Sequence, residues 1–388
     1  MKLVFYSIVL NHHQACLADE FYKILGDDYT FVETAECHDQ KGASEDYSKR
    51  PYIVKAWESS DAWEIAMRLA ETAGVGVFGG HDALPFEKAR MKKGLLSFDM
   101  SERMLKRGWL NLFSPRIFKM VLAYHLGGWS KKPIYKLCMS AFAAKDQYKL
   151  HSFHGKCYKW GYFTHVDEDF DAEALMMDAS TSEITPLMWC SRFLTWKHPE
   201  LPVQMAKRLK DKGYKFQLSM YGDEGNAAKH DGIYTRKSLQ ELIEKLDVKD
   251  CVQLMGSHPN HEILSEMRKN CIFLFTSDKQ EGWGAVANEA LSNGCVLVAS
   301  DAIGSAPFLV KEGDNGFLFK SGDVDSLTSK VEWLLLHPAE MRRMQLSAYS
   351  VMKTMWSPRK AAENLLELID NLTNNRVPSI NEGPCSIA

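Results

Sequence analysis

Residues 277–319 read SDKQEGWGAVANEALSNGCVLVASDAIGSAPFLVKEGDNGFLF and carry the clearest structural signal in the chain. The apolar runs at 271–276 and 296–300 are nearly continuous, which is typical of strands that a parallel sheet buries on both faces. Residues 285–292 lie between them and have the composition of a helix. A strand, a helix and a second strand in this order indicate a Rossmann-like α/β unit.

The same alternation extends along the rest of the chain. In the second half, further strands are predicted at 187–190, 216–221 and 252–255, and helices at 199–212, 237–246, 259–269, 324–336, 338–353 and 358–374. In the first half, strands are predicted at 2–9, 29–33, 75–78, 95–98, 135–139 and 156–160, and helices at 14–25 and 60–72. The expected fold class is therefore α/β, with two Rossmann-like parallel-sheet domains.

A polar and acidic stretch at 168–185 separates the two halves. We expect an N-terminal domain at 1–175 and a C-terminal domain at 183–357. Ligands should bind at the carboxyl ends of the strands, in a cleft where the two domains face each other. Residues 375–388 are predicted to form a disordered tail.

The composition excludes several classes of protein. Hydrophobic residues make up 45% and charged residues 25% of the 388 residues, which is an ordinary globular mixture. The net charge of −3 is not that of a dedicated nucleic-acid-binding protein, so no nucleic-acid partner is expected. The nine cysteines show no C-x-x-C spacing, which indicates reduced thiols in the cytosol rather than disulfides or a zinc site. No apolar run reaches the length of about 18 residues that a membrane-spanning helix needs.

Two glutamates are the strongest candidates for ligand binding. Glu281 lies in the loop after a predicted strand, and Glu289 follows eight positions later on the next helix. Carboxylate oxygens accept hydrogen bonds from the vicinal hydroxyls of a sugar or a ribose, and the helix N-terminus near Ala285 offers N–H groups to a phosphate. The spacing alone is equally compatible with a solvated loop glutamate and a glutamate on a helix surface.

The sequence resembles the family-4 glycosyltransferases, which have the two-domain GT-B fold. The C-terminal resemblance rests on EGWGAVANEA at 281–290, NGCVLVAS at 293–300, EGDNGFLF at 312–319 and the stretch 189–225. The N-terminal half resembles bacterial capsule and exopolysaccharide enzymes of this family through NHHQ at 11–14, DMSERMLKRG at 99–108 and CYKWGYF at 157–163. The resemblance also implies that the helix at 358–374 crosses back and packs on the first domain.

The resemblance implies a nucleotide-diphosphate sugar as donor, with UDP-sugars commoner than GDP-sugars, and neither a cofactor nor a metal ion. Arg192 and Lys197 would hold the diphosphate instead, since Arg offers a planar fork and Lys a compact charge. Glu289 would hold the ribose hydroxyls, and Glu281 would face the donor sugar. Further donor contacts are implied for Gly222, Met255, Gly256, Gly282, Trp283, Gly284, Ala285 and Val286. Relatives have glycine after the lysine, where this chain has His198, so the shape of that loop stays open.

The N-terminal domain is expected to hold the acceptor. His12 and His13 follow the first predicted strand, and His13 is a candidate contact to the diphosphate or the acceptor hydroxyl. Asp99 and Glu102 follow a later strand and are candidate catalytic or sugar-contact residues, at a place where many relatives have histidine instead of Asp99. His81 is a further candidate at a strand end.

Residues 88–136 contain 12 Lys and Arg residues against two acidic ones, and aromatic and aliphatic side chains alternate with them. A basic face beside Trp and Phe suits anionic lipid headgroups at the inner face of the membrane, or a lipid-diphosphate acceptor. The solvated face of an ordinary amphipathic helix has the same pattern.

These predictions together indicate a retaining, metal-independent, hexosyltransferase-like glycosyltransferase. It would move a sugar from a nucleotide-diphosphate sugar to a lipid-linked or other saccharide acceptor in the synthesis of a capsule or exopolysaccharide. It would be cytoplasmic and peripherally associated with the membrane. The alternatives are a GT-B nucleotide-sugar epimerase and a non-catalytic protein that binds sugar nucleotides or docks on a membrane.

Overall fold

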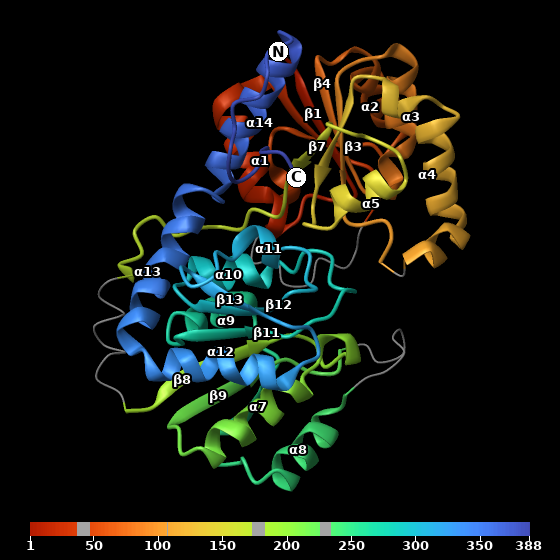
Figure 1. Ribbon diagram of the computed structural model, residues 1–388. Coiled ribbons are helices and arrows are strands. Elements are labelled where there is room, and N and C mark those ends of the chain that lie inside the picture. The colour runs from red at the N-terminus through yellow and green to blue at the C-terminus, as the bar shows by residue number, and fades with distance from the viewer. Residues whose placement is uncertain (37–46, 107, 173–182, 226–233) are drawn as a thin grey trace. The chain divides into compact units, whose positions relative to one another are not determined.

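The computed structural model describes residues 1–36, 47–106, 108–172, 183–225 and 234–388. The chain divides into two compact units, a first unit formed by 1–165 and 355–388 and a second unit formed by 166–354. Each unit contains one parallel sheet with helices packed against it (Figure 1). The α/β class with two Rossmann-like sheets, predicted from the sequence, is confirmed.

The first unit holds a seven-stranded sheet in the order β3-β2-β1-β4-β5-β6-β7. Its strands are β1 Leu3–Ser7, β2 Tyr29–Glu33, β3 Ile53–Lys55, β4 Val75–Gly79, β5 Ser97–Ser101, β6 Ile134–Cys138 and β7 Cys157–Lys159. Its helices are α1 His12–Leu25, α2 Ser60–Thr72, α3 Leu84–Lys93, α4 Pro115–His125, α5 Ala143–Lys149 and α14 Pro358–Thr373. The last of these, α14, packs against α1 (Figure 1).

The second unit holds a six-stranded sheet in the order β10-β9-β8-β11-β12-β13. Its strands are β8 Thr185–Cys190, β9 Phe216–Tyr221, β10 Val252–Gly256, β11 Ile272–Phe275, β12 Val296–Ser300 and β13 Gly316–Phe319. Its helices are α7 Glu200–Asp211, α8 Arg236–Lys245, α9 Asn260–Met267, α10 Val286–Ser292, α11 Ala306–Leu309, α12 Val324–Leu336 and α13 Pro338–Thr354. The central strands β11 and β12 are buried along their whole length, as expected for apolar strands covered on both faces.

The division of the chain differs in detail from the one expected. Residues 166–172 group with the second unit instead of the first. Residues 355–388, which include the helix expected to pack on the first domain, group with the first unit. Much of the predicted boundary falls on residues 173–182, which lie outside the described residues.

The C-terminal end is not the disordered tail that the sequence suggested. The Cys385 N–H donates to the Lys159 carbonyl and the Lys159 N–H donates to the Ser386 carbonyl, both at 2.8 Å. Tyr158 and Ile387 form an antiparallel bridge. β7 is the last strand of its sheet, and an edge strand has unpaired backbone groups that this segment satisfies.

Two cations of the basic stretch at 88–136 belong to the core of the first unit. Arg90 is fully buried and donates to backbone carbonyls, among them those of Ala70, Ala73 and Gly74. Lys136 is also fully buried. A third cation, Arg107, lies outside the described residues. Arg90 and Lys136 therefore do not belong to the basic face predicted for this stretch.

In the part of the chain that the structure describes, no helix combines the length and the apolar character needed to cross a bilayer.

Candidate active site

The strand order of the second unit reverses at β8. β9 lies on one side of β8, and β11 lies on the other. Doubly wound sheets bind ligands at the carboxyl ends of the strands beside such a reversal. The loops that leave β8 and β11 at this end carry Arg192, Lys197 and Glu281, so the chain order itself brings three predicted site residues to one place.

Lys197 and Glu281 form a buried ion pair between these two loops. Their side chains are only 11% and 10% exposed, and Lys197 Nζ donates to Glu281 Oε2. Ser277 Oγ donates to the same carboxylate oxygen at 3.0 Å. Burial lowers the pKa of Lys197, and the neighbouring Glu281 carboxylate partly offsets this effect. A pair removed from water keeps its electrostatic strength, because little solvent screens it.

Hydrogen bonds hold the two loops together. The Trp189 indole N–H donates to Thr276 Oγ1 at 2.9 Å, and Thr276 Oγ1 donates to the Lys197 carbonyl at 2.7 Å. The Asp278 N–H donates to the Trp196 carbonyl at 2.9 Å. The position of the ion pair is therefore set by the backbone rather than by flexible side chains alone.

Arg192 differs from Lys197 in being exposed. No carboxylate among the described residues pairs with its guanidinium, so the N–H groups of the guanidinium are available to bind a ligand. Next to it, Gly222 has a φ of 133°, and a Cβ there would lie 1.8 Å from the Ser191 carbonyl oxygen. The loops after β8 and β9 can approach this closely only with glycine at that position.

His198 resolves the open question about the loop shape. Its φ and ψ are 52° and 54°, the left-handed conformation that glycine adopts easily and that other residues rarely adopt. His198 Nδ1 lies 2.9 Å from Glu200 Oε1, and Nε2 lies 3.8 Å from Asp278 Oδ2. The carboxylates of Asp278 and Glu200 beside the ring raise the pKa of His198 to about 9. The histidine therefore has a conformation suited to the glycine of the relatives, and two carboxylates hold it there.

Glu289 lies in the first turn of α10, where Asn260 Nδ2 donates to its Oε1 at 3.1 Å. Burial raises the pKa of Glu289 to about 7. Near neutral pH, the side chain can therefore both accept and donate hydrogen bonds to vicinal hydroxyls. Asn260, at the start of α9, was not predicted from the sequence, and an isolated asparagine gives no pattern by which to find it.

The glycine-rich segment between the two glutamates is shaped by its own core. Trp283 is buried, and its indole N–H donates to Asn288 Oδ1 at 2.8 Å. Gly284 has a φ of 79°, and a Cβ there would lie 2.3 Å from the Phe275 ring. Gly282 is buried, Ala285 caps α10 and Val286 begins it. The Trp283 side chain thus fixes the loop, and only backbone groups of the segment remain as candidate ligand contacts.

Met255 and Gly256 end β10 beside this site. The Met255 side chain is exposed, and Gly256 has a φ of 89°. The Gly222 N–H donates to the Gly256 carbonyl at 2.8 Å, which joins the ends of β9 and β10.

The first unit has its own cavity, of about 680 Å³, at the carboxyl ends of β1, β4 and β5. The strand order of this sheet reverses at β1, between β2 and β4, so the cavity again lies where such sheets bind ligands. The predicted residues Asp99, Glu102 and His81 all border it.

The acidic candidates of the first unit are already paired. Asp99 is buried and accepts hydrogen bonds from Lys136 Nζ and, at 3.2 Å, from the Tyr124 hydroxyl. Glu102 accepts from Lys106 Nζ at 2.7 Å. Asp99 and Glu102 thus border the cavity with cations already beside their carboxylates, and their predicted roles remain predictions.

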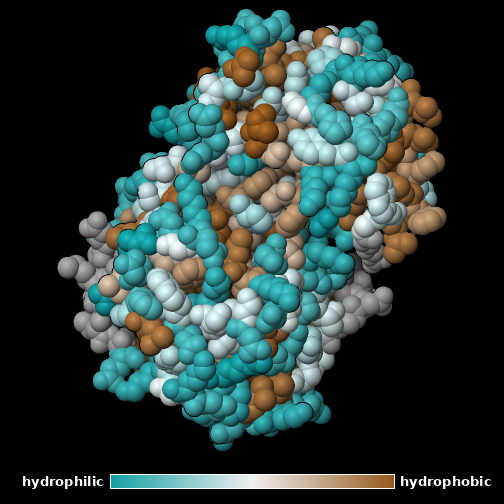
Figure 2. Space-filling view, viewed as in Figure 1, coloured by the Kyte–Doolittle hydropathy of each residue, from teal (hydrophilic) through white to brown (hydrophobic). Residues whose placement is uncertain are grey.

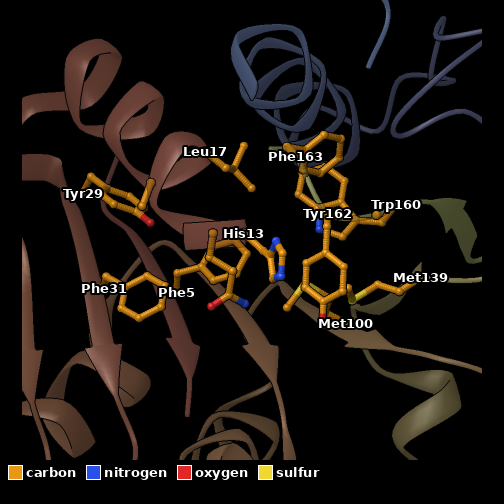
Figure 3. Close-up of a pocket in the computed structure, with 13 residues that line it drawn as sticks. Phe5, His13, Leu17, Tyr29, Phe31, Met100, Met139, Trp160, Tyr162 and Phe163 are labelled. Atoms are coloured by element: carbon orange, nitrogen blue, oxygen red, sulfur yellow. The ribbon is translucent and has the colours of Figure 1, made fainter. Parts of the chain in front are cut away.

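His13 lies near a small neighbouring pocket, which is lined mainly by aromatic and methionine side chains (Figure 3). Its ring centroid is 5.4 Å from that of Tyr162 and 3.8 Å from that of His12. Asn11 caps α1 through its side chain, which accepts from the His13 N–H at 3.0 Å. The end of β1 and the start of α1 therefore place both histidines at the carboxyl edge of the sheet.

Comparison with known proteins identifies the second unit. Residues 187–351 match the family model described as "Glycosyl transferases group 1". The second unit is thus similar to group 1 glycosyltransferases over most of its length. The matched segment contains the Lys197–Glu281 pair, Arg192 and Glu289, whereas His13, a predicted contact to the diphosphate, lies outside it.

Individual relatives agree with this assignment. The chain is 28% identical over 182 residues to a trehalose synthase of Pyrococcus horikoshii, which covers 47% of this chain and 43% of that protein. It is 26% identical over 177 residues to the amylovoran biosynthesis glycosyltransferase AmsK of Erwinia amylovora, covering 44% and 40%. The matches thus span less than half the length of these curated relatives.

The fold likeness extends over nearly the whole chain. The crystal structure of Anabaena HepE in complex with UDP superposes with a TM-score of 0.69 over 96% of this chain and 100% of that one, at 14% identity. The GT-B fold predicted from the sequence is therefore confirmed for both units.

Proposed function

We propose that this protein is a retaining glycosyltransferase that transfers a sugar from a nucleotide-diphosphate sugar to a saccharide acceptor in polysaccharide synthesis. The observation that carries the proposal is the buried Lys197–Glu281 pair, with exposed Arg192 nearby, at the strand-order reversal of a group 1 glycosyltransferase domain. The similarity to AmsK, an amylovoran biosynthesis glycosyltransferase, supports polysaccharide synthesis as the setting.

The proposed chemistry centres on the leaving diphosphate. As the bond between the anomeric carbon and the diphosphate oxygen breaks, negative charge grows on the phosphate. Arg192 would hold the phosphate oxygens through its planar fork, and Lys197 would add a fixed positive charge at the loop that carries Glu281. We propose that these two cations replace a metal ion. The acceptor hydroxyl would attack the face that the diphosphate leaves, and its proton would pass to the departing phosphate oxygen.

Glu289 would bind the ribose hydroxyls of the donor, because a carboxylate accepts from two vicinal hydroxyls. A UDP-sugar is the first choice of donor and a GDP-sugar the second. HepE, which shares the fold, has been solved with UDP and with UDP-glucose, and this supports the order of preference.

The acceptor would bind in the first unit. We also propose that the protein associates peripherally with the cytoplasmic face of the membrane. The segment at Gly108–Phe113 and helix α4 leave large apolar side chains exposed, and Phe113 is 85% exposed. Apolar residues gather along the edge where Figure 1 places α4 (Figure 2). Arg116 and Lys119 lie on the same helix. An apolar face with cations beside it suits anionic lipid, so the acceptor would be lipid-linked.

The test measures release of nucleotide from UDP-glucose, UDP-galactose, UDP-N-acetylglucosamine and GDP-mannose, with and without a bacterial lipid extract and with and without EDTA. We expect release from one donor that the lipid extract stimulates and EDTA leaves unchanged, with the sugar recovered in the lipid fraction. Conversion of the donor to its epimer without an acceptor would favour an epimerase. Absence of both reactions and of nucleotide binding would contradict the proposal.

A further inference from the structure

Glu87 in α3 is a buried carboxyl group that borders the cavity of the first unit. Its exposed fraction is 6%. Its Oε1 is enclosed and has no hydrogen-bond partner. Among the residues that the structure describes, neither oxygen of this carboxyl accepts or donates a hydrogen bond. Because a buried carboxyl without a partner is costly, a group that fills the cavity should supply one.

The surroundings of Glu87 keep it uncharged. Asp99 lies nearby and already pairs with the buried Lys136 and with the Tyr124 hydroxyl, while the guanidinium of the other buried cation, Arg90, is bonded to backbone carbonyls. One buried cation does not neutralise two buried carboxylates, so one of the acids retains its proton. Burial, and then the charge of Asp99, raise the pKa of Glu87 well above its usual range. When protonated, the carboxyl group of Glu87 at the border of this cavity offers one hydroxyl donor and one carbonyl acceptor.

The other walls of the cavity suit a polar ligand with negative charge. Lys88, Arg116 and Lys119 border it, and none of them forms an ion pair with another described residue. A volume of about 680 Å³ lies within the ~300–1,000 Å³ usual for small-molecule sites. The cavity thus combines one neutral acid with several free cations.

We propose that Glu87 is an acceptor-recognition residue: its carboxyl group forms a hydrogen bond with a hydroxyl group of a saccharide that carries phosphate. The cations of the cavity bind the phosphate. This inference rests on the proposed function, and it names the substrate class that the first unit accepts.

The experiment measures binding of glucose 1-phosphate, mannose 1-phosphate and N-acetylglucosamine 1-phosphate, with methyl glucoside as the uncharged comparison. Ligand-observed NMR on the full-length chain, saturated with UDP to occupy any donor site, gives the affinities. We expect at least one sugar phosphate to bind in the millimolar range and more tightly than methyl glucoside. Glu87→Leu should weaken that binding at least tenfold, whereas Glu87→Gln, which keeps a donor and an acceptor, should weaken it by less than about threefold.

The affinity for UDP serves as the control and distinguishes a failure of the proposed function from a failure of the Glu87 inference. This affinity should be unchanged in both Glu87 variants if Glu87 binds only the acceptor. If Glu87→Leu folds poorly, a crystal of the wild-type chain soaked with the sugar phosphate tests the contact instead. The saccharide oxygen should lie within hydrogen-bond distance of the Glu87 carboxyl group. The inference is overturned if no sugar phosphate binds while UDP does, if Glu87→Leu binds as tightly as wild type, or if the soaked sugar lies elsewhere. Absence of UDP binding would count against the proposed function instead.

Discussion

Lys197 and Glu281 depend on each other because both are buried. Removing the lysine leaves a buried carboxylate that, among the described residues, keeps the Ser277 hydroxyl as its side-chain hydrogen-bond donor. Breaking a buried ion pair in this way typically costs about 3–5 kcal/mol, whereas replacing both charges by neutral groups costs much less. Stability and catalysis can therefore be separated at this site.

We expect Lys197→Met to lower the free energy of unfolding of the second unit by about 3–5 kcal/mol. The double variant Lys197→Met with Glu281→Gln should recover most of this loss, yet transfer sugar at least 100-fold more slowly than wild type, because a charge facing the diphosphate is gone. Urea unfolding and the nucleotide-release rate measure the two effects. A double variant that is as active as wild type would exclude a catalytic role for the pair.

His198 makes the stability of the second unit depend on pH. Its folded-state pKa of about 9 lies above the unfolded value of about 6.5, so the protonated form is favoured by folding. The stabilisation is complete below pH 6.5 and is lost as the pH rises through 9.

We expect the stability of the wild-type chain to fall by about 2 kcal/mol more than that of His198→Gly between pH 6.5 and 9.5. Glycine tolerates the left-handed backbone at this position, so the variant removes the charge without adding strain. Thermal unfolding at a series of pH values measures the difference. Parallel pH profiles for the two proteins would show that the Asp278 and Glu200 contacts do not hold a proton on His198.

At the residue scale, the predicted donor residues come from a motif, and their roles remain predictions. The eight-residue spacing of Glu281 and Glu289 and the cations after β8 could be read from the sequence. The burial of Glu87, Arg90 and Lys136 could not be predicted, because surface and buried charged residues look alike in a sequence. Only the packing of α3, β5 and β6 shows that these three residues are buried. Asn260 also escaped notice, since its contact with Glu289 joins separate helices.

At the scale of elements, the C-terminal segment acts as an added edge of the first sheet. Cys385 is fully buried, and Asn364 Nδ2 of α14 donates to the Pro384 carbonyl at 2.8 Å. These contacts tie the segment to both β7 and α14. Its removal would expose the backbone groups of β7 and the apolar surface beneath Cys385.

We expect deletion of residues 383–388 to lower the thermal midpoint of the first unit by several degrees, equivalent to about 2–4 kcal/mol. UDP binding should remain, because the proposed donor residues lie in the other unit. Differential scanning calorimetry and UDP titration provide the two readouts. An unchanged thermal midpoint would mean that the segment contributes nothing to the stability of the sheet.

Long apolar strands were predicted well because burial on both faces leaves a continuous signal, as in β11 and β12. The four-residue strand β13 is absent from the predicted strands, because its start at Gly316 lies inside the glycine-rich stretch EGDNGFLF. The three-residue strand β3 gave too short a pattern to detect. The C-terminal segment has a turn-like composition, and its order comes from pairing with β7, which is distant in the sequence.

For the whole molecule, the exposed apolar face of α4 and Gly108–Phe113 predicts membrane association. We expect the chain to float with vesicles that contain 30% anionic phospholipid and to stay in solution with purely zwitterionic vesicles. Arg116→Glu with Lys119→Glu should abolish flotation, since each cation near an anionic surface contributes about 1 kcal/mol.

The matched control is Lys207→Glu with Lys237→Glu, which changes charge equally on exposed helices of the second unit. This control should float like wild type. Equal binding of wild type and the α4 variant to anionic vesicles would contradict a role of Arg116 and Lys119 in membrane association.

Isothermal titration of UDP in the presence of EDTA, with wild type, Arg192→Ala and the exposed-cation control Lys237→Ala, tests whether side chains alone hold the diphosphate. We expect wild type and the control to bind UDP without metal, and Arg192→Ala to bind at least tenfold more weakly while unfolding at the same temperature. UDP binding that needs a divalent metal, or that Arg192→Ala leaves intact, would contradict a diphosphate clamp at the ends of β8 and β11.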